Sequence, residues 1–583
     1  MSLRRTVRVA VVVATAFAML AIFRPEPAGA AAVRLAASVA VATYGDDVTL
    51  AGTVGGQGAC ADGRTVRLRW QPADATGFAL LAETAVAPDG TFGFDVTPSV
   101  NARYRVAVAA SGACPPEVSN EVPVRVRARV DASIVVGSSV AGSCVDVTAI
   151  VSPAKPGQTV ELQRRAGRWR TVETLPLNGD SAARSHPCLG WDDLGVARYR
   201  VRWTSQDALN DAAASPILAF EVVRAGWMER IDDIVGRRPI SISVGEDGVY
   251  LYRHLDQADR TPASNEKLLL AMAMLDAFGP DHRIQTIAAT SRLDGARIDG
   301  DLWLLGHGDP IVTRSTLAGL ADAIVDAGVR RVTGRVMGST SYFARDWEAR
   351  GWNSVATDYV NRPTALTFEG NRSDDPERAA AEALTRQLET RDVAVRGRPG
   401  SGDAPAGVDP IAISRSKPMS TLLAKMLRPS WNFAAEVLGK GLGVAFRGTP
   451  GTISKGAAAI EAWVRANGVG DFELFDSSGL SYANRVDAAG IVRLLWAAEA
   501  ASWGDALRGA LPGGGQGTLE DRLERVRIRA KTGTLSDVSS LSGWVWAERT
   551  GSWIEFSVVS DIGKPAAEDI EDKIVRILSN NVR

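Results

Sequence analysis

Short runs in which apolar and polar residues alternate dominate residues 35–223. Residues 66–70 (VRLRW) and 104–108 (YRVAV) are examples, and they have the two-residue period of a strand with one buried face. Turn sequences such as Asp89-Gly90 and Ser152-Pro153 separate the runs. The pattern therefore predicts that this part of the chain is all-β.

The same region repeats once along the chain. The sequence DVTL at residues 47–50 is echoed by DVTA at 146–149, and ARYRV starts at Ala102 and again at Ala197. Two consecutive β-sandwich modules of immunoglobulin-like type explain this repeat, the first at residues 31–127 and the second at 128–224. No residue pattern in either module indicates chemistry.

After about residue 225, helical periods begin to mix with strands. Residues 240–244 and 249–253 predict a hairpin around Asp247-Gly248, and a helix follows from about 262 to 278. Two strands from the start of this region and three from its end predict one five-stranded antiparallel sheet, which would bring distant motifs together. The later predicted helices are 419–428, 432–442, 454–467, 488–500 and 566–580, and the later strands are 527–532, 541–547 and 553–559.

Composition agrees with several folded domains and argues against a nucleic-acid partner. The chain has 583 residues, 45% hydrophobic and 23% charged, which is more than one core usually supports. The formal net charge is -1 at pH 7, so no excess of positive charge is available to neutralise phosphates. Only nine of the basic residues are lysines, which makes each lysine-containing motif informative.

Residues 1–30 have the features of a secretory signal. Arg4 and Arg5 precede a mostly apolar run at 9–23, and Ala28-Gly29-Ala30 fits a cleavage site. An uncleaved membrane anchor is the alternative, but this run of fifteen residues is shorter than the ~20 that span a bilayer. We therefore expect an exported protein that is secreted or associated with the cell wall.

Four cysteines, Cys60, Cys114, Cys144 and Cys188, all lie before residue 190. In an exported protein an even number of cysteines indicates disulfides. Proximity in the sequence favours Cys60–Cys114 and Cys144–Cys188, one in each module, although three connectivities are possible. Free buried thiols are an alternative, and a metal site is disfavoured because no C-x-x-C sequence occurs and His186 is the only histidine nearby.

Ser264-Asn265-Glu266-Lys267 contains a candidate nucleophile and its base. The spacing puts a hydroxyl and an amine on one face of a helix's first turn, and Thr261-Pro262 before it are a suitable cap and first-turn proline. Ser152/Lys155 and Ser414/Lys417 have the same S-x-x-K spacing, but a neighbouring proline disfavours a helix that begins at either serine. Context therefore singles out Ser264.

Two further motifs carry polar groups that such a site could use. Ser430-Trp431-Asn432 follows Pro429, which leaves a polar pair on a turn between helices. Lys531-Thr532-Gly533-Thr534 ends a predicted strand, where a lysine, two hydroxyls and a glycine that permits close backbone approach could hold a carboxylate. Taken alone, the first motif is more often a helix cap, and the second is more often a strand end before a turn.

In the order S-x-x-K, S-x-N, K-T-G, these motifs resemble those of the penicillin-recognising serine enzymes, the DD-peptidases and serine β-lactamases. Gly308-Asp309-Pro310, residues 476–481 (DSSGLS) and residues 511–519 (LPGGGQGTL) are similar to runs in class C low-molecular-mass penicillin-binding proteins, the D-Ala-D-Ala carboxypeptidase/endopeptidases. The resemblance covers about residues 226–583. It implies a multidomain chain whose α/β penicillin-binding, β-lactamase-like domain, with a helical subdomain, occupies residues 225–282 and 410–583, with an α/β domain inserted at 283–409.

The resemblance also implies how the nucleophile works. Neutral Lys267 would take the proton of Ser264 as the hydroxyl attacks the penultimate D-Ala carbonyl to form an acyl-enzyme. The backbone N–H groups of Ser264 and Thr534 would stabilise the oxyanion. The pKa of Lys267 must then fall from ~10.4, which burial and the nearby charge of Lys531 would cause.

The remaining motif residues would bind the substrate and release the product. Ser430 and Lys531 would relay a proton to the leaving D-alanine, and Asn432 would hold the peptide backbone. Thr532 and Thr534, beside Gly533, would bind the terminal carboxylate. No cofactor or metal is implied, and the expected partners are peptidoglycan stem peptides ending in D-Ala-D-Ala and β-lactams as covalent inhibitors.

Three other interpretations are weighed against this one. A serine β-lactamase-like hydrolase is the nearest alternative, and a catalytically silent cell-wall-binding protein is one of another class, which the intact motifs argue against. A Ser-His-Asp hydrolase is disfavoured because none of the four histidines lies in a recognisable motif. Trp431 departs from the small or acidic residue usual in S-x-N, and either packs against helices or narrows the cleft.

Overall fold

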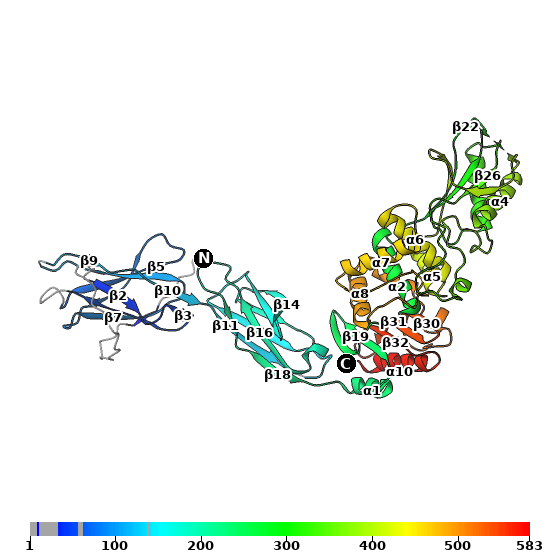
Figure 1. Cartoon of the computed structure of the whole chain (residues 1–583). Coiled ribbons are helices and arrows are strands. Elements are labelled where there is room, and N and C mark those ends of the chain that lie inside the picture. Colours follow the sequence, from blue (N-terminus) through cyan, green and yellow to red (C-terminus); the bar gives the residue numbers. More distant parts are fainter. Residues whose placement is uncertain are drawn as a thin grey trace. The chain divides into compact units, whose positions relative to one another are not determined.

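The computed structural model describes residues 8–10, 33–55, 62–112, 114–136, 139–470 and 472–582. The chain divides into two compact units, Met1–Val223 and Arg224–Arg583, which run from blue to cyan and from green to red in Figure 1. Within the described ranges, every helix is too short or too polar to span a bilayer.

Two sheets enclose one apolar core in the first half of the N-terminal unit. Their orders are β1-β7-β4-β2 and β3-β10-β8-β5-β6, with β9 paired to β8. Every second side chain is buried along β7 and β8, and those of both sheets pack into one cluster, which is the predicted strand period. The strands are β1 (Arg8–Ala10), β2 (Val33–Ala37), β3 (Val41–Thr43), β4 (Val48–Val54), β5 (Thr65–Pro72), β6 (Ala79–Ala85), β7 (Thr91–Thr97), β8 (Ala102–Val108), β9 (Glu117–Val118) and β10 (Val122–Arg127).

The second half of the unit repeats this two-sheet plan. One sheet has the order β11-β12-β15 and the other β14-β13-β16-β17, with β18 paired to β16. The two ARYRV sequences lie in β8 and β16, and their tyrosines, Tyr104 and Tyr199, are both fully buried. The strands are β11 (Arg129–Val135), β12 (Asp146–Ser152), β13 (Thr159–Ala166), β14 (Arg168–Pro176), β15 (Ala182–Ser185), β16 (Gly195–Trp203), β17 (Ala213–Ala214) and β18 (Leu218–Val222).

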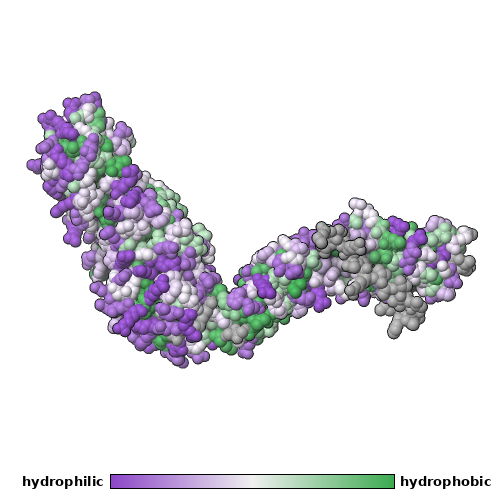
Figure 2. All heavy atoms as spheres, turned by 180° about the vertical axis from the view of Figure 1, so that it is seen from behind, coloured by the Kyte–Doolittle hydropathy of each residue, from purple (hydrophilic) through white to green (hydrophobic). Residues whose placement is uncertain are grey.

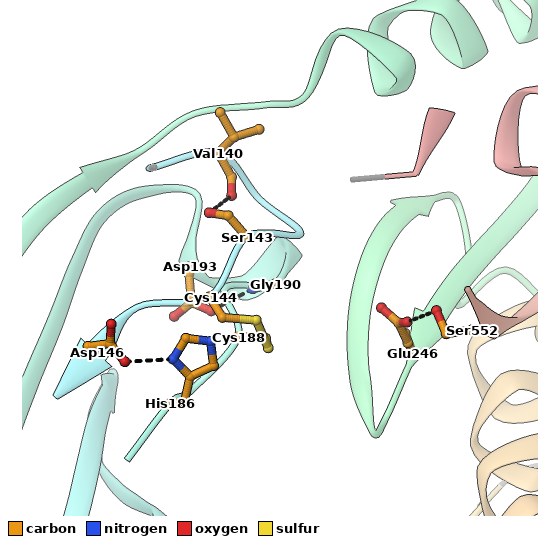
Figure 3. Close-up of a disulfide and its surroundings, with 10 residues drawn as sticks. All are labelled: Val140, Ser143, Cys144, Asp146, His186, Cys188, Gly190, Asp193, Glu246 and Ser552. Atoms are coloured by element: carbon orange, nitrogen blue, oxygen red, sulfur yellow. Dashed lines mark hydrogen bonds and ion pairs between the residues drawn. A yellow bond between two sulfur atoms is a disulfide. The ribbon is translucent and has the colours of Figure 1, made fainter. Parts of the chain in front are cut away.

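One predicted disulfide, Cys144–Cys188, is present in this second half (Figure 3). It closes a segment with a sequence separation of 44, and beside it His186 Nδ1 lies 2.8 Å from Asp146 Oδ1. Cys114 is also disulfide-bonded, but its predicted partner Cys60 lies outside the described residues. The Cys144–Cys188 prediction is therefore confirmed.

Of the predicted signal sequence, only β1 is described, and it pairs antiparallel with β7. The other residues of the segment 1–30 lie outside the described ranges. Cleavage of the segment stays a prediction.

A five-stranded antiparallel sheet, β20-β19-β32-β31-β30, is the centre of the C-terminal unit. As predicted, two strands come from the start of the unit and three from its end. Helices α8 and α2 lie above this sheet in Figure 1, and α10 and α1 lie below it. The strands are β19 (Ile240–Glu246), β20 (Val249–His254), β30 (Ile528–Leu535), β31 (Val538–Ala547) and β32 (Ser552–Ser560), and the helices are α1 (Gly226–Val235), α2 (Glu266–Phe278), α5 (Met419–Leu427), α6 (Asn432–Arg447), α7 (Ile453–Ala466), α8 (Ala488–Ala500), α9 (Gly504–Ala510) and α10 (Ala566–Asn581).

Helix α2 is apolar on nearly all sides and is accordingly buried in the core formed with α5, α6 and α7. It begins later than predicted, because a separate 3-10 turn, Ala263–Asn265, precedes it. The predicted cap at Thr261 is wrong, since neither helical segment has a side-chain cap and Thr261 Oγ1 accepts a hydrogen bond from Arg485 at 3.1 Å. Ala263 has a φ of 48°, so the chain turns sharply just before the candidate nucleophile.

The inserted part has its own core and two small sheets, β28-β26-β24-β21-β29 and β22-β23-β25-β27. Strand β29 pairs with β21, so this part continues beyond the predicted boundary at residue 409. Its elements are β21 (Gln285–Thr290), β22 (Leu293–Asp294), β23 (Arg297–Ile298), β24 (Leu302–Gly306), α3 (Arg314–Asp326), β25 (Arg331–Val332), β26 (Val336–Ser339), α4 (Pro376–Glu389), β27 (Ala394–Val395), β28 (Gly400–Gly402) and β29 (Asp409–Arg415). On the face shown in Figure 2, hydrophilic residues cover most of the C-terminal unit, with smaller apolar patches between them.

Candidate active site

One cavity of about 430 Å³ is lined by side chains from all three predicted motifs. Those side chains are Ser264, Ser430, Asn432, Thr532 and Thr534. They come from the turn before α2, the turn before α6 and the end of β30, which are far apart in the sequence. Strand β30 of the five-stranded sheet packs against the turn that carries Ser264, and the junction between α5 and α6 brings Ser430 and Asn432 to the same cavity.

Lys267 lies in the first turn of α2 with no exposed surface, and its amine contacts three neutral oxygen atoms. Its Nζ is 2.9 Å from Ser264 Oγ, 2.7 Å from Asn432 Oδ1 and 2.5 Å from the carbonyl oxygen of Ser478. A neutral amine has two N–H donors and one lone pair. It can therefore donate to Asn432 and Ser478 while its lone pair accepts the hydroxyl proton of Ser264.

Burial lowers the pKa of Lys267 to about 8, and nearby carboxyl groups oppose this shift. Burial and the charge of Lys531 are the two causes predicted for a lowered pKa of Lys267, and the structure supports burial. Burial, and secondarily the charge of Lys267, lower the pKa of Lys531 well below its usual value. Both amines therefore lose their protons more readily than exposed lysines do.

Lys531 lies across the cavity from Lys267 and contacts the second motif. Its Nζ donates to Ser430 Oγ at 2.9 Å and to the carbonyl oxygen of Thr532 at 2.7 Å. Thr532 Oγ1 donates to Thr518 Oγ1 at 2.6 Å, so the run at residues 511–519 also contributes to the cavity wall. Two serine–lysine pairs, Ser264–Lys267 and Ser430–Lys531, consequently face one space.

Close backbone packing holds the nucleophile turn against β30. A Cβ atom on Gly533 would lie 3.0 Å from the backbone nitrogen of Ser264 and would collide with Ser540 Oγ, so only glycine fits. Ala263 and Ser430 both have a positive φ, 48° and 58°, although neither is glycine. Such conformations cost about 1–3 kcal/mol each and are typical of functional sites.

A cluster of three buried carboxyl groups, Glu266, Glu436 and Asp476, lies behind Lys267 and was not predicted as part of the site. Glu436 Oε1 accepts hydrogen bonds from the backbone N–H groups of Ser477 at 3.0 Å and Ser478 at 2.8 Å. It thereby helps to fix Ser478, the residue whose carbonyl oxygen contacts Lys267. In the sequence, the one indication of a role for Glu436 is its position one helical turn after Asn432 of the S-x-N motif.

Asp476 organises the DSSGLS loop, and Glu266 completes the cluster. Asp476 accepts hydrogen bonds from the backbone N–H groups of residues 479–481 and from Asn484 Nδ2, which also donates to Glu266. Burial, followed by the charge of Asp476, raises the pKa of Glu436 to about 7 and that of Glu266 well above its usual value. Both glutamates therefore hold protons more tightly than exposed ones do.

The inserted part supplies lining residues that sequence patterns did not identify. Asn353, Val355, Ala356 and Tyr359 line the cavity, and the carbonyl oxygen of Tyr359 accepts a hydrogen bond from Asn432 Nδ2 at 3.4 Å. These residues fall outside any regular period, so only the folded chain reveals them. Within the described residues, no group of three or more His, Cys, Asp or Glu side chains could hold a metal ion.

Two residues singled out in the sequence lie away from the cavity lining. Trp431 is partly buried against the helical core, with its ring 5.4 Å from that of Phe433, and it does not line the cavity. Of its two predicted placements, packing against helices is therefore the correct one. Asp309 is buried, its pKa raised to about 6 by burial, and its carbonyl oxygen accepts a hydrogen bond from Thr367 at 2.5 Å, so Gly308-Asp309-Pro310 is a structural turn.

Comparisons with known proteins agree with this geometry. A D-alanyl-D-alanine carboxypeptidase of Actinomadura sp. (strain R39) is 27% identical over 507 residues, which are 70% of this chain and 89% of the relative. A carboxypeptidase of Mycobacterium tuberculosis is 28% identical over 402 residues, 62% of this chain and 84% of the relative. Penicillin-binding protein 4 of Haemophilus influenzae has the same fold, with a TM-score of 0.53 at 19% identity over 60% of this chain and 99% of that chain.

A family model covers most of the C-terminal unit. The D-Ala-D-Ala carboxypeptidase 3 (S13) family matches residues 237–374 and 363–581. This match takes in all three motifs and more than half of the chain. The resemblance to class C low-molecular-mass penicillin-binding proteins is thus confirmed, and the chain belongs to the D-Ala-D-Ala carboxypeptidase 3 (S13) family of serine peptidases.

Proposed function

We propose that the chain is a serine-type D-Ala-D-Ala carboxypeptidase that removes the terminal D-alanine of peptidoglycan stem peptides through an acyl-enzyme on Ser264. The contact between Ser264 and the buried amine of Lys267, at 2.9 Å, carries the proposal. The family match and the carboxypeptidase relatives support the same reaction.

Acylation uses both serine–lysine pairs. Neutral Lys267 takes the proton of Ser264 as Oγ attacks the carbonyl carbon, and the N–H groups of Ser264 and Thr534 hold the oxyanion. As the amide bond breaks, Ser430 gives its proton to the leaving nitrogen and regains one from Lys531, to which it is hydrogen-bonded. Water then hydrolyses the ester, giving its hydroxyl to the acyl product and a proton to Ser264 Oγ. The proton taken by Lys267 returns to Lys531, so that both amines regain their starting states.

The residues around the two serine–lysine pairs bind the substrate. The hydroxyls of Thr532 and Thr534 face the cavity and bind the terminal carboxylate of the leaving D-alanine, with positive charge from Lys531. Asn432 holds the peptide backbone. β-Lactams, which carry a carboxylate beside a strained amide, acylate Ser264 in the same way.

The proposal also covers the N-terminal unit and the compartment in which the protein acts. The two-sheet halves of this unit are immunoglobulin-like modules, at residues 31–127 and 128–224, that present the catalytic unit outside the cytoplasm. The disulfide Cys144–Cys188 supports an oxidising compartment. Residues 1–30 would direct export and would then be removed.

Incubation with benzylpenicillin tests the proposal. Mass spectrometry of a tryptic digest should find the adduct on the peptide with Ser264, and the protein should release D-alanine from a D-Ala-D-Ala peptide. Ser264→Ala should lower both rates by at least about 10⁴-fold. Ser152→Ala, which changes the serine of another S-x-x-K sequence, is the matched control and should behave as wild type.

The same experiment separates the peptidase from a β-lactamase. A DD-peptidase keeps its penicilloyl adduct far longer than a β-lactamase, which hydrolyses it rapidly. An adduct that disappears within seconds would favour the β-lactamase. Activity retained by Ser264→Ala would remove Ser264 as the nucleophile.

A further inference from the structure

One face of the sheet β14-β13-β16-β17, in the second half of the N-terminal unit, carries a row of arginines. Side chains along β16 alternate between buried and not buried, and Arg198, Arg200 and Arg202 all lie on the side that is not buried. Alternate residues of a strand are about 7 Å apart, which spaces three positive charges along one line. Arg165 of the neighbouring strand β13 adds a fourth charge, and we call these four side chains the arginine face.

The indole ring of Trp169, in β14, holds two of these arginines in place. The guanidinium of Arg200 lies 4.3 Å from the centroid of this ring, and that of Arg165 lies 5.6 Å from the same centroid. Arg200 Nε also donates to Gln163 Oε1 at 2.9 Å, and this amide oxygen carries no charge. The guanidinium groups are thus positioned by neutral partners, which leave their charge in place.

Positive charge is in excess on the arginine face. Within the described residues, Arg165, Arg198 and Arg200 form no ion pair, and Arg202 has the carboxylate of Glu161 at 3.8 Å. Burial, followed by the charges of Arg202 and Arg165, lowers the pKa of Arg200. The formal net charge of the whole chain is -1, so this local excess of positive charge is offset elsewhere. The arginine face can therefore attract anions although the chain as a whole is nearly neutral.

The first half of the N-terminal unit has a carboxylate beside its equivalent arginines. Its ARYRV sequence, in β8, provides Arg103 and Arg105 at the positions that the second half gives to its own ARYRV arginines in β16. The carboxylate oxygens of Glu121 lie 3.3 Å from Arg103 and 3.9 Å from Arg105. The arginines of the first repeat are therefore ion-paired, whereas those of the second repeat are not.

Ile217 stands in the second half where Glu121 stands in the first. Ser119 Oγ accepts a hydrogen bond from the backbone N–H of the valine of ARYRV in β8 at 3.0 Å, and Ser215 Oγ accepts one from the same valine position in β16, also at 3.0 Å. Two residues after these serines come Glu121 and Ile217. Ile217 is 54% exposed. Equivalent backbone positions thus carry a neutralising carboxylate in one half and an exposed apolar side chain in the other.

We propose that the arginine face binds a linear polyanion of the cell wall that carries one phosphate in each repeat, of the chemistry of poly(glycerol phosphate). Arginine binds phosphate oxygens with two parallel N–H donors, and a row of arginines matches successive phosphates of one chain. The choice of a wall polymer over a nucleic acid rests on the export that belongs to the proposed function, whereas the charge argument is independent of catalysis. Binding would keep the exported protein at the wall on which its catalytic unit acts.

Isothermal titration of the full chain with a short synthetic poly(glycerol phosphate) tests the inference. Binding should weaken by at least about five-fold when the salt concentration rises from about 50 mM to about 200 mM, because salt competes for the phosphates. Arg198→Glu should weaken binding by about five-fold. Arg103→Glu changes the equivalent arginine of the first half, whose side chain is 63% exposed, and as the matched control should bind within about two-fold of wild type.

Ile217→Glu tests the comparison of the two halves without removing an arginine. It adds a carboxylate where the first half has Glu121, so it should neutralise part of the arginine face and weaken binding by about three-fold. Because Ile217 is exposed, the fold should tolerate the change. Ile217→Gln adds a polar side chain without charge and should bind as wild type does.

Three results would overturn the inference. They are no binding of the polymer by wild type, an equal loss of binding in Arg198→Glu and Arg103→Glu, and tighter binding to vesicles of phosphatidylglycerol and phosphatidylcholine than to the polymer. The last result, if it depended on Arg198, would assign the arginine face to a lipid surface.

Release of D-alanine from a soluble D-Ala-D-Ala peptide, measured for the same variants, separates this inference from the proposed function. The variants should release D-alanine at the wild-type rate, because the changes lie outside the catalytic unit. Polymer binding that depends on Arg198 supports the arginine face even if no D-alanine is released, in which case only the proposed function fails. Release of D-alanine without polymer binding would leave the proposed function standing and remove the arginine face as a binding site.

Discussion

Two lysines of this chain follow a serine by three residues and are buried, yet their environments differ. Lys155, in the N-terminal unit, donates to Asp207 Oδ2 and Asn210 Oδ1, both at 2.8 Å, and its side chain is 4% exposed. Lys267, with no exposed surface, contacts only neutral oxygens, one of which is Ser264 Oγ. The same spacing thus yields an ion pair in one unit and, in the other, a buried amine beside a serine hydroxyl.

The difference follows from the elements that carry each pair. Ser152 ends strand β12, and among the described residues it shares no hydrogen bond with Lys155. Ser264 and Lys267 lie on consecutive helical turns, which brings hydroxyl and amine together. With only neutral oxygens in direct contact, burial lowers the pKa of Lys267.

The largest expected effect comes from removing the base. Lys267→Met has similar volume and no proton acceptor, so acylation of Ser264 by benzylpenicillin should slow by about 10⁴-fold, measured by stopped-flow or by mass spectrometry of the adduct. Lys155→Met should acylate at the wild-type rate. A loss of less than about ten-fold in Lys267→Met would show that another group takes the proton.

The pH dependence of acylation should report Lys267. Its pKa of about 8 means that the amine becomes protonated, and cannot act as base, as the pH falls below 8. The second-order rate constant should therefore fall by about 50-fold from pH 8 to pH 6, approach a ten-fold fall per pH unit at lower pH, and level off well above pH 8. A rate constant that does not change between pH 6 and pH 8 would contradict this assignment.

Replacement of Lys155, the buried lysine of the N-terminal unit, should lower stability and leave catalysis unchanged. Lys155→Met removes the amine that donates to both the Asp207 carboxylate, which is 25% exposed, and the buried side chain of Asn210. Because Asp207 keeps some contact with water, the free energy of unfolding of the N-terminal unit should fall by about 2 kcal/mol, below the range for fully buried pairs. Urea denaturation of the full chain, with D-alanine release measured in parallel, tests both halves of this expectation.

The sequence predicted elements where the hydrophobic period was regular. The five strands of the central sheet and helices such as α8, predicted at 488–500, follow from apolar periods that the core preserves. The start of α2 was predicted too early, because nothing in the local sequence reveals that Ala263 takes a positive φ. That conformation is imposed by close packing against β30, which is a tertiary effect.

The site was predicted as far as its residues belong to motifs. Ser264, Ser430 and Lys531 meet as the family resemblance implies, since each motif ends or begins a regular element. The cavity wall from the inserted part and the buried carboxyl groups were missed. Glu436 and Glu266 look like ordinary helix residues in the sequence. Only their complete burial beside Lys267 shows that they belong to the surroundings of the site.

The smallest expected effect is that of replacing Glu436, one of the buried carboxyl groups near Lys267. Glu436 has a pKa of about 7, and its charge raises the pKa of Lys267. Glu436→Gln keeps an oxygen to accept from Ser477 and Ser478 but carries no charge, so the pKa of Lys267 should fall and acylation near pH 7 should become a few-fold faster. The gain should vanish below about pH 5.5, where Glu436 is protonated in wild type as well.

A matched control distinguishes charge from packing in this last comparison. Glu555 is another buried carboxyl group, its pKa raised to about 8 by burial, but it accepts from Trp496 and does not act on Lys267. Glu555→Gln should leave the pH profile of acylation unchanged. If Glu436→Gln slowed acylation at every pH and lowered the melting temperature, Glu436 would act by fixing the Ser478 peptide, and the tuning of Lys267 by its charge would be wrong.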